Sequence, residues 1–321
     1  MIQEAISKPL TRGSCLQESR SERGFILIVA LAMLSVLTVL SVQYTRLTRN
    51  ASERSGGASD QLAGFYAAEA GLERVKARLG ADTGAPDWPG EPWADTHAMP
   101  GRLNGWAVAV HVTDEEGKIN LNAADPDMLS RLFEQFGLRR QERDILSASL
   151  LDWIDSNDLH RLNGAESDYY KSKGLLTGAR NAPLDAVEEI LQIRGAPADL
   201  LDRTARHGKA SHSFAACVRI TGDTRVNLNT APPPVMLALG FTKEEVARLR
   251  DARAKSPWTS VSNISSVIGD ARAEFFKSRL TVSSSWFLVE STASRPGAQS
   301  VSVFARLLRA HGRIYTAGFW A

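Results

Sequence analysis

The stretch Gly24-Phe-Ile-Leu-Ile-Val-Ala-Leu-Ala-Met-Leu-Ser-Val-Leu-Thr-Val-Leu-Ser-Val42 contains no charged residue. A helix over its apolar part, Phe25–Val42, would be about 27 Å long at about 1.5 Å per residue, which matches the hydrocarbon layer of a bilayer. An uncharged core helix of a soluble protein is the alternative. Lys and Arg lie on both sides of the run, so charge does not orient it. The stretch predicts a transmembrane helix over residues 25–45.

The position of Gly24 distinguishes two kinds of N-terminal signal. A secretory signal peptide has its small-residue cleavage site after the apolar run, but Val42-Gln-Tyr-Thr45 is a poor site of that kind. Arg23-Gly24 stands before the run and resembles the end of a type IV prepilin leader. In that family a prepilin peptidase cuts after the glycine and methylates the next residue. The resemblance implies a leader over residues 1–24, Phe25 as the methylated N-terminus, and a body outside the inner membrane.

The fifth residue after the expected cut is Val29. Most pilins and pseudopilins carry glutamate there, paired with the N-terminal amine of a neighbouring subunit. A carboxylate in the bilayer costs about 2.5–3.5 kcal/mol and is normally kept for a partner. Among proteins that resemble this chain, the absence of that glutamate is characteristic of the tip subunit of the type II secretion pseudopilus, the protein K family.

The chain after the apolar run has the pattern of an amphipathic helix. Apolar residues recur at roughly helical spacing: Leu47, Leu62, Phe65, Tyr66, Leu72, Val75 and Leu79. Ser55-Gly-Gly57 is a candidate kink. The segment Phe65–Glu73 resembles the pilin-like signature, and a Pro- and Trp-rich loop at residues 86–93 ends the helix.

Alternating residues then predict strands. The expected ranges are 106–112, 214–220, 281–291, 300–310 and 313–320. We expect an α+β fold, in which a pilin-like long N-terminal helix packs on an antiparallel sheet and a large, mainly α-helical insert interrupts the body. The expected parts are residues 46–113 (amphipathic helix and first strand), 114–280 (insert) and 281–321 (C-terminal strands).

Candidate helices fill the insert at residues 128–136, 140–154, 184–193, 234–239, 243–254 and 261–268. Within it, Ile119-Asn-Leu-Asn-Ala-Ala124 is echoed by Val226-Asn-Leu-Asn-Thr-Ala231, and each copy precedes Pro and a short apolar helix. Helix capping by Asn and Thr explains the echo. The phrase also resembles the start of helix-hairpin-helix modules, which bind DNA backbone. A formal net charge of +2 gives that alternative little support.

Residues 152–170 read Asp-Trp-Ile-Asp-Ser-Asn-Asp-Leu-His-Arg-Leu-Asn-Gly-Ala-Glu-Ser-Asp-Tyr-Tyr. This segment closely resembles the DWxD…GAExxYY segment of the protein K family, and residues 114–122, 181–191 and 226–231 match that family in the same order. The resemblance implies a minor pseudopilin that initiates or caps the periplasmic pseudopilus and aids export of folded proteins. The implied partners are other minor pseudopilins, the prepilin peptidase, and secreted substrates or the outer-membrane channel.

The same segment is rich in hard oxygen ligands of the kind that Ca²⁺ prefers. The spacing is not that of an EF-hand, and capping acids at a helix end are the alternative. Family members are reported to bind calcium in the insert, so the resemblance favours a structural Ca²⁺ site. The candidate ligands are Asp155, Asp158 and Glu166, followed by Asp152, Asn157 and Glu188.

Other function classes find little support in the sequence. The paired acids and His160 alone would suit acid–base work, but the chain has no H-E-x-x-H, G-x-S-x-G, P-loop or G-x-G-x-x-G motif, so we do not expect an enzyme. With Cys15 in the leader, the mature chain keeps only Cys217, which we expect to be a buried small hydrophobe. We expect no nucleic-acid partner. A membrane-anchored helix-hairpin-helix DNA-binding protein of a competence pilus remains the alternative function.

Overall fold

The computed structural model describes residues 19–321 except 83, 85, 95–100, 176–177 and 208–209, and only the backbone of residues 19–24, 26 and 47–56. The expected leader residues 1–18 lie outside the described part. The chain divides into one unit that ends at Leu62 and a second unit, Ala63–Ala321. Each unit is described by itself.

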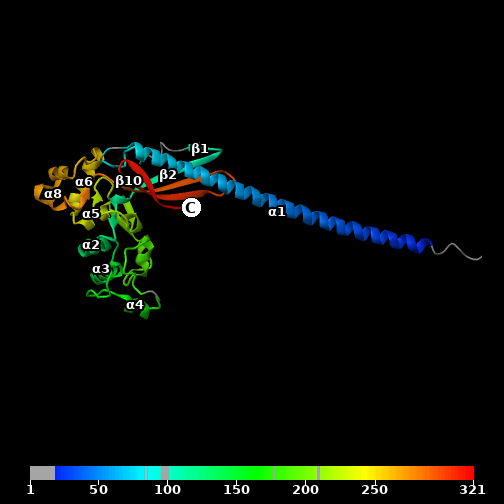
Figure 1. Cartoon of the computed structure of the whole chain (residues 1–321), viewed down its shortest axis with the longest axis horizontal. Helices are drawn as coiled ribbons and strands as arrows, with labels where there is room; N and C mark the ends of the chain where they lie inside the picture. The colour runs from blue at the N-terminus through cyan, green and yellow to red at the C-terminus, as the bar shows by residue number, and fades with distance from the viewer. Residues whose placement is uncertain (1–18, 83, 85, 95–100, 176–177, 208–209) are drawn as a thin grey trace, which may run out of the picture. The chain divides into compact units, whose positions relative to one another are not determined.

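The first unit is part of one long helix, α1 (Ser19–Ala81), and the backbone stays helical through Ser55-Gly-Gly57 (Figure 1). Within the described residues, Leu27–Arg46 is the segment long and apolar enough to span a membrane, with a mean hydropathy of 2.2. Most of its side chains are exposed, as in Leu27 and Leu31, which are 69% and 64% exposed. A bare apolar helix of this length is what a lipid-embedded or bundle-forming segment requires.

In the second unit, the C-terminal part of α1 packs on a sheet. Its buried face includes Ala68, Leu72, Val75 and Leu79, as the helical spacing predicts. A Cβ at Gly71 would overlap Ser291 Oγ and lie 2.8 Å from Val108 Cγ1, so this glycine permits the close approach of helix and sheet. The stripe expected from the sequence is too wide, because Leu62 and Tyr66 are exposed; Leu47 lies among the residues without described side chains.

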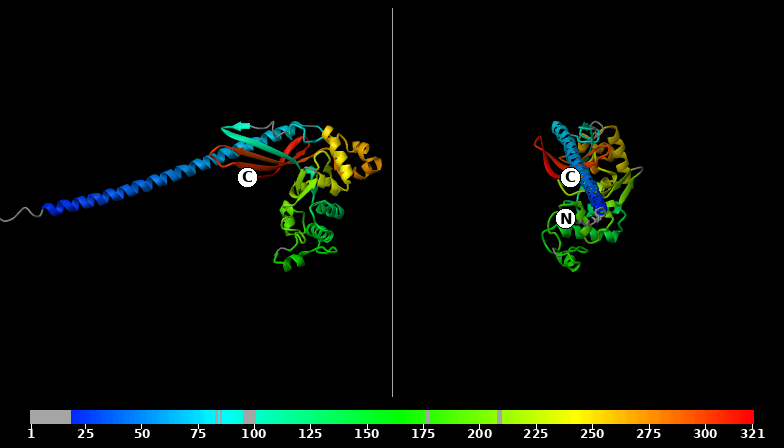
Figure 2. Two further views of the ribbon diagram at one scale, coloured as in Figure 1. Left: turned by 180° about the vertical axis from the view of Figure 1, so that it is seen from behind. Right: turned by 90° about the vertical axis from the view of Figure 1, so that its right-hand side faces the viewer.

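The sheet has five antiparallel strands in the order β1-β2-β9-β10-β11. They are β1 (Gly101–Leu103), β2 (Trp106–Asp114), β9 (Trp286–Ser294), β10 (Val301–Ala310) and β11 (Arg313–Trp320). Strand β2 pairs with β9, so that Asp114 lies opposite Phe287. Alternate residues of β2 are buried beneath α1, and Figure 2 shows α1 crossing the strands.

The remaining elements of the described residues all lie between β2 and β9 in the sequence. The helices are α2 (Pro126–Gln135), α3 (Arg140–Ile154), α4 (Ser167–Ser172), α5 (Pro233–Leu239), α6 (Lys243–Lys255), α7 (Ser265–Ile268) and α8 (Asp270–Phe276). The 3₁₀ turns are η2 (Glu115–Gly117), η3 (Val187–Gln192), η4 (Leu200–Asp202), η5 (Ala215–Cys217) and η6 (Val261–Ile264). The short strands are β3 (Ile119–Asn120), β4 (Thr204–His207), β5 (Ala210–Ser213), β6 (Val218–Arg219), β7 (Val226–Asn227) and β8 (Leu280–Thr281).

The second unit contains two hydrophobic cores. One lies between α1 and the sheet and includes Trp93, Trp106 and Phe287. The other fills the insert around Phe133, Phe214 and Phe276. Because β2 and β9 are neighbours, the insert leaves the sheet and returns to it at the same end, which lets each core pack around its own elements.

The α+β architecture is the expected one, and most predicted elements are present. Four details were wrong. Residues 214–220 form η5 and β6 instead of one strand, and the strand expected from 281 begins at Trp286. The helix expected at 184–193 is the 3₁₀ turn η3, and the helix expected at 261–268 is split into η6 and α7. Cys217 is fully buried, as expected, and burial raises the pKa of its thiol to about 12, which keeps it unreactive.

Candidate functional site

Three of the six candidate metal ligands lie together at the end of α3. Asp152 is in the last turn of α3, Asp155 caps its C-terminus, and Glu166 precedes α4 as its N-cap residue. One carboxylate oxygen from each lies within 4.8 Å of the others. Asp152 and Asp155 at the end of α3 and Glu166 before α4 thus form one group of carboxylates, which we call the acidic cluster.

Glu166 is the least compensated member of the acidic cluster. It is 1% exposed, and neither of its carboxylate oxygens has a hydrogen-bond partner. Burial raises the pKa of Glu166 to about 7, and the charges of Asp152, Asp155 and Asp158 add to the effect. A buried carboxylate without a donor is costly, so this side chain indicates a place where a cation would be favourable.

Arg161 partly neutralises the other two acids. Its Nη1 lies 2.7 Å from Asp152 Oδ1 and also pairs with Asp155. Its backbone N–H donates to Asp152 Oδ1 and Oδ2 at 3.3 and 3.2 Å. The loop approaches so closely that a Cβ at Gly164 would overlap Asp152 Oδ2. Sequence reasoning missed Arg161 and Gly164, although both stand inside the segment that predicted the site.

The other three candidates take different positions. Asp158 is exposed and accepts hydrogen bonds from Ser167 Oγ at 2.8 Å and Asn181 Nδ2 at 3.1 Å; these donors lower its pKa. Asn157 donates to Asp155 Oδ1 at 2.8 Å and so shapes the turn. Glu188 is exposed on η3 and is not part of the acidic cluster.

The acidic cluster fits a hard cation by its donor set. It supplies carboxylate oxygens and no thiolate, and His160 Nε2 is engaged with Asp168 Oδ1 at 3.1 Å. Oxygen ligands of this kind suit Ca²⁺ and give little to a transition metal that prefers nitrogen or sulfur. Asp152, Asp155 and Glu166 are therefore the side chains that could hold such an ion.

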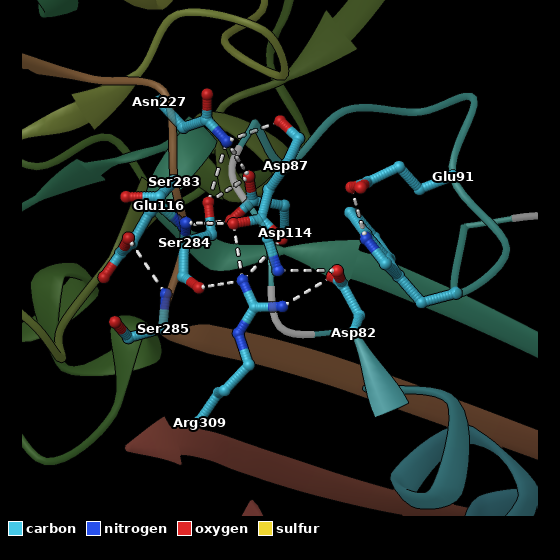
Figure 3. Close-up of polar contacts among 12 residues, drawn as sticks. Asp82, Asp87, Glu91, Asp114, Glu116, Asn227, Ser283, Ser284, Ser285 and Arg309 are labelled. Atoms are coloured by element: carbon cyan, nitrogen blue, oxygen red, sulfur yellow. Dashed lines mark hydrogen bonds and ion pairs between the residues drawn. The ribbon is translucent and has the colours of Figure 1, made fainter. Parts of the chain in front are cut away.

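A second polar site joins the insert to the sheet. We call it the polar junction and define it by Asp87, Asp114, Asn227, Ser284 and Arg309 (Figure 3). Arg309 Nη2 lies 2.5 Å from both carboxylate oxygens of Asp87 and 2.7 Å from the carbonyl oxygen of Ser284. Its Nη1 donates to Asp82 Oδ2 at 2.7 Å. The guanidinium thus fixes the loop after α1 against the end of β10.

Asp114 is the acceptor at the centre of the polar junction. Its Oδ2 accepts from Thr230 Oγ1 at 2.6 Å, Ser284 Oγ at 2.7 Å and Asn227 Nδ2 at 2.9 Å. Its Oδ1 accepts from the N–H of Glu116 at 2.8 Å. Burial raises the pKa of Asp114, and these donors oppose the rise. Such a satisfied buried network specifies one arrangement of the two cores.

The echoed asparagines act as long-range clamps. Asn122 donates to the carbonyl of Leu184 at 3.1 Å and accepts from its N–H at 2.7 Å. Asn229 does the same with Trp258, at 3.0 and 2.8 Å. The capping prediction was wrong, because Asp125 caps α2 and α5 has no side-chain cap. The short helix expected after each copy is present, and a Pro residue stands in its first turn.

The expected processing residues lie on α1. Phe25 is exposed, Val29 is half-buried, and Gly24 has a helical backbone whose surroundings are not described. All three residues thus lie in the N-terminal part of α1.

Comparison of the sequence with known proteins gives three matches. Residues 102–207 match the family model described as Type II secretion system (T2SS), protein K. The type II secretion system protein K of Klebsiella pneumoniae is 30% identical over 267 residues, which cover 75% of this chain and 78% of that protein. The protein K of Pectobacterium carotovorum subsp. carotovorum is 22% identical over 297 residues, covering 84% and 87%.

The fold has a counterpart among solved structures. A chain in the crystal structure of the GspK-GspI-GspJ complex from the enterotoxigenic Escherichia coli Type 2 Secretion System superposes with a TM-score of 0.69 at 15% identity, over 83% of this chain and 98% of that one. This similarity confirms the predicted α+β fold. With the sequence match to the Klebsiella pneumoniae protein, it leads to one conclusion: the chain belongs to the type II secretion system protein K family.

Proposed function

We propose that this minor pseudopilin is the tip subunit of the pseudopilus of a type II secretion system, where it initiates or caps the filament and aids export of folded proteins across the outer membrane. The observation that carries the proposal is the insertion of every element from η2 to β8 between the neighbouring strands β2 and β9. Bodies of a filament shaft pack side by side and leave no room for such bulk, whereas an end does. Val29, in place of the pairing glutamate, supports the same position.

The partners follow from the family and from its solved relative. The similar chain was crystallised with two other subunits, GspI and GspJ. We propose that this chain likewise assembles with the other minor pseudopilins of its own system. The apolar helix Leu27–Arg46 would anchor it in the inner membrane as a single pass, with the second unit in the periplasm. Contact with secreted substrates or the outer-membrane channel stays a prediction.

Filament labelling tests the tip role. The full chain is expressed with an epitope tag, and pseudopili are sheared from the cells and treated with a gold-labelled antibody. The gold label should appear at one end of each filament. A tagged major pseudopilin is the control and should be labelled along the filament. Label from this chain along the shaft would contradict the proposal.

Processing is a separate prediction. Cleavage after Gly24 by the prepilin peptidase would leave N-methylated Phe25 as the first residue, and mass spectrometry of the purified chain reads that terminus directly. Gly24→Leu should leave the leader attached. A mature chain that begins at any other residue would contradict the processing prediction without touching the tip role.

We also propose that Ca²⁺ binds the acidic cluster through Asp152, Asp155 and Glu166, with Asp158 beside them. The bound ion would supply positive charge and no chemistry. The buried, unpartnered carboxylate of Glu166 supports this proposal. Arg161 is the competing cation, and its side chain is 42% exposed, so it can turn toward solvent.

Calcium should raise the melting temperature of the detergent-solubilised full chain after chelation. Binding to the folded state alone stabilises by about 2.7 kcal/mol at a hundredfold excess over Kd. Glu166→Gln should abolish this rise, whereas Glu188→Gln, which changes an exposed candidate outside the acidic cluster, should preserve it. The same rise in both variants would exclude the acidic cluster as the site.

The structure gives the DNA-binding alternative no support at the starts of α3 and α6, the second helices after each copy of the asparagine echo. At the start of α3, the N–H of Arg139 donates to Glu142 at 2.8 Å. At the start of α6, the N–H of Thr242 donates to Glu245 at 2.8 Å. A DNA phosphate would need such N–H groups free and would be repelled by these carboxylates. No nucleic-acid partner is therefore proposed.

A further inference from the structure

A cleft of about 890 Å³ lies between α2, β4, α5 and α6. Pro233, Leu237 and Val246 contribute apolar surface to it. A second cavity of about 570 Å³ adjoins the cleft and shares Ala247 and Arg250 with it, and Trp88 lines that part. The two cavities meet at Ala247 and Arg250 and together form a groove along α6, with the mixed apolar and polar lining that suits an extended chain segment.

The groove is lined with cations that have no carboxylate partner. Arg206, Lys243 and Arg250 make no ion pair with any residue that the structure describes. The acids nearby compensate them only in part. Glu134 accepts from Arg143 Nη1 at 2.8 Å. Glu244, next to Lys243, and Asp251 are exposed and interact with the cations without a close ion pair. The lining therefore carries a net positive charge.

Neighbouring groups respond to this charge. His207 lines the cleft with a buried Nδ1 that has no partner. Burial lowers its pKa, and the charges of Arg250 and Lys243 lower it further. Arg253 is held by the carbonyl oxygens of Leu228 and Ala231 at 2.7 and 2.8 Å, and burial together with Arg250 lowers its pKa to about 10. In both groups burial is the main cause, and the charge of Arg250 adds to it.

We propose that this groove binds an acidic, extended polypeptide segment of a partner protein. Its carboxylates would pair with Arg206, Lys243 and Arg250, and its alternate apolar side chains would enter the apolar part of the cleft. A nucleic acid fits less well, because Pro233, Leu237 and Val246 make the cleft partly apolar. Charge complementarity with an apolar centre is the usual composition of a specific protein interface. The proposal goes beyond the tip role and does not depend on it.

Fluorescence anisotropy of the detergent-solubilised full chain tests the proposal. The probe is a short fluorescein-labelled peptide in which Glu and Leu alternate, with empty micelles as the blank. Lys243→Glu with Arg250→Glu should weaken binding at least about tenfold and should create affinity for the peptide in which Lys replaces Glu. Arg250→Gln alone should weaken binding by a smaller factor.

The matched control is Arg248→Glu with Lys255→Glu, which makes the same charge change at exposed positions of α6 that do not line the groove. It should bind the acidic peptide like the parent chain, and the melting temperatures of both double variants check the fold. Equal loss in both double variants would overturn the proposal. So would displacement of the peptide by duplex DNA or inorganic phosphate at equal charge concentration. Neither result would affect the tip role, which the filament labelling tests.

Discussion

Glu116 is a buried carboxylate at the edge of the polar junction. It accepts the N–H of Ser285 at 3.1 Å and is 8% exposed. Burial raises its pKa to about 7, the charge of Asp114 adds to the rise, and Arg219 opposes it. The folded protein therefore holds this proton at a pH at which the unfolded chain has released it.

Glu116→Gln should stabilise the protein at neutral pH. Across the window from about 4.5 to about 7 the folded state binds more protons at this site than the unfolded state, so the free energy of unfolding falls as pH rises. The variant has no carboxylate to ionise here, so its free energy of unfolding should exceed that of the parent by roughly 1–3 kcal/mol at pH above 7. Urea unfolding of the full chain at a series of pH values measures the difference.

The control for this pH dependence is Glu274→Gln, which changes a carboxylate that is 73% exposed. It should follow the parent curve at every pH. A Glu116→Gln curve parallel to that of the parent would show that Glu116 is already ionised in the folded state below pH 7.

The residues of the acidic cluster could be predicted from the sequence, whereas those of the polar junction were not. Asp152, Asp155 and Glu166 stand within one acidic segment, so local reading was enough to group them. Asp114 and Arg309 are far apart in sequence and escaped notice. A signal existed in the alternation of the strands. Asp114 stands at an alternate position that continues the buried series of Val110 and Val112. Arg309 likewise follows buried Leu307 by two residues. A charged residue at an inward-facing strand position indicates that it has a buried partner.

At the scale of elements, the sequence predicted the helices and strands whose bounds depend on local residue patterns. Helix α3 and strand β11 have the predicted bounds. The asparagine echo was misread as capping, because Leu184 and Trp258, which the clamps bind, lie far along the chain. No local pattern marks a backbone partner at such a separation.

The packing of α1 on the sheet gives a prediction at this scale. Gly71→Ala should lower the free energy of unfolding by about 1–3 kcal/mol, because the new Cβ would overlap Ser291 Oγ and crowd Val108 and Val110. Urea unfolding of the full chain, followed by tryptophan fluorescence, measures the loss.

Gly80→Ala is the matched control in the same helix. The nearest atom to its new Cβ is Ile314 Cγ1, at 3.8 Å, so this variant should be stabilised by up to about 1 kcal/mol through helix propensity. If Gly71→Ala behaves like Gly80→Ala, α1 does not pack on the sheet at this distance in solution.

At the scale of the second unit, the polar junction connects two cores that apolar packing alone would leave independent. Asn227, from β7 of the insert, donates to Asp114 of the sheet, and Ser284 stands where the chain re-enters the sheet. Asp87 is fully buried and balanced chiefly by Arg309. The cooperativity of the two cores should therefore depend on this single guanidinium.

Arg309→Met should destabilise the protein by about 3–5 kcal/mol, because it leaves the buried Asp87 carboxylate unpaired. Calorimetry of the full chain should show one main transition for the two cores of the parent and two separated transitions for the variant. Arg313→Met, at an exposed position of β11, should keep the parent profile. Adding Asp87→Asn to Arg309→Met should recover part of the loss, since it removes the unpaired charge. A single unshifted transition in Arg309→Met would mean that the two cores are coupled by some contact other than the polar junction.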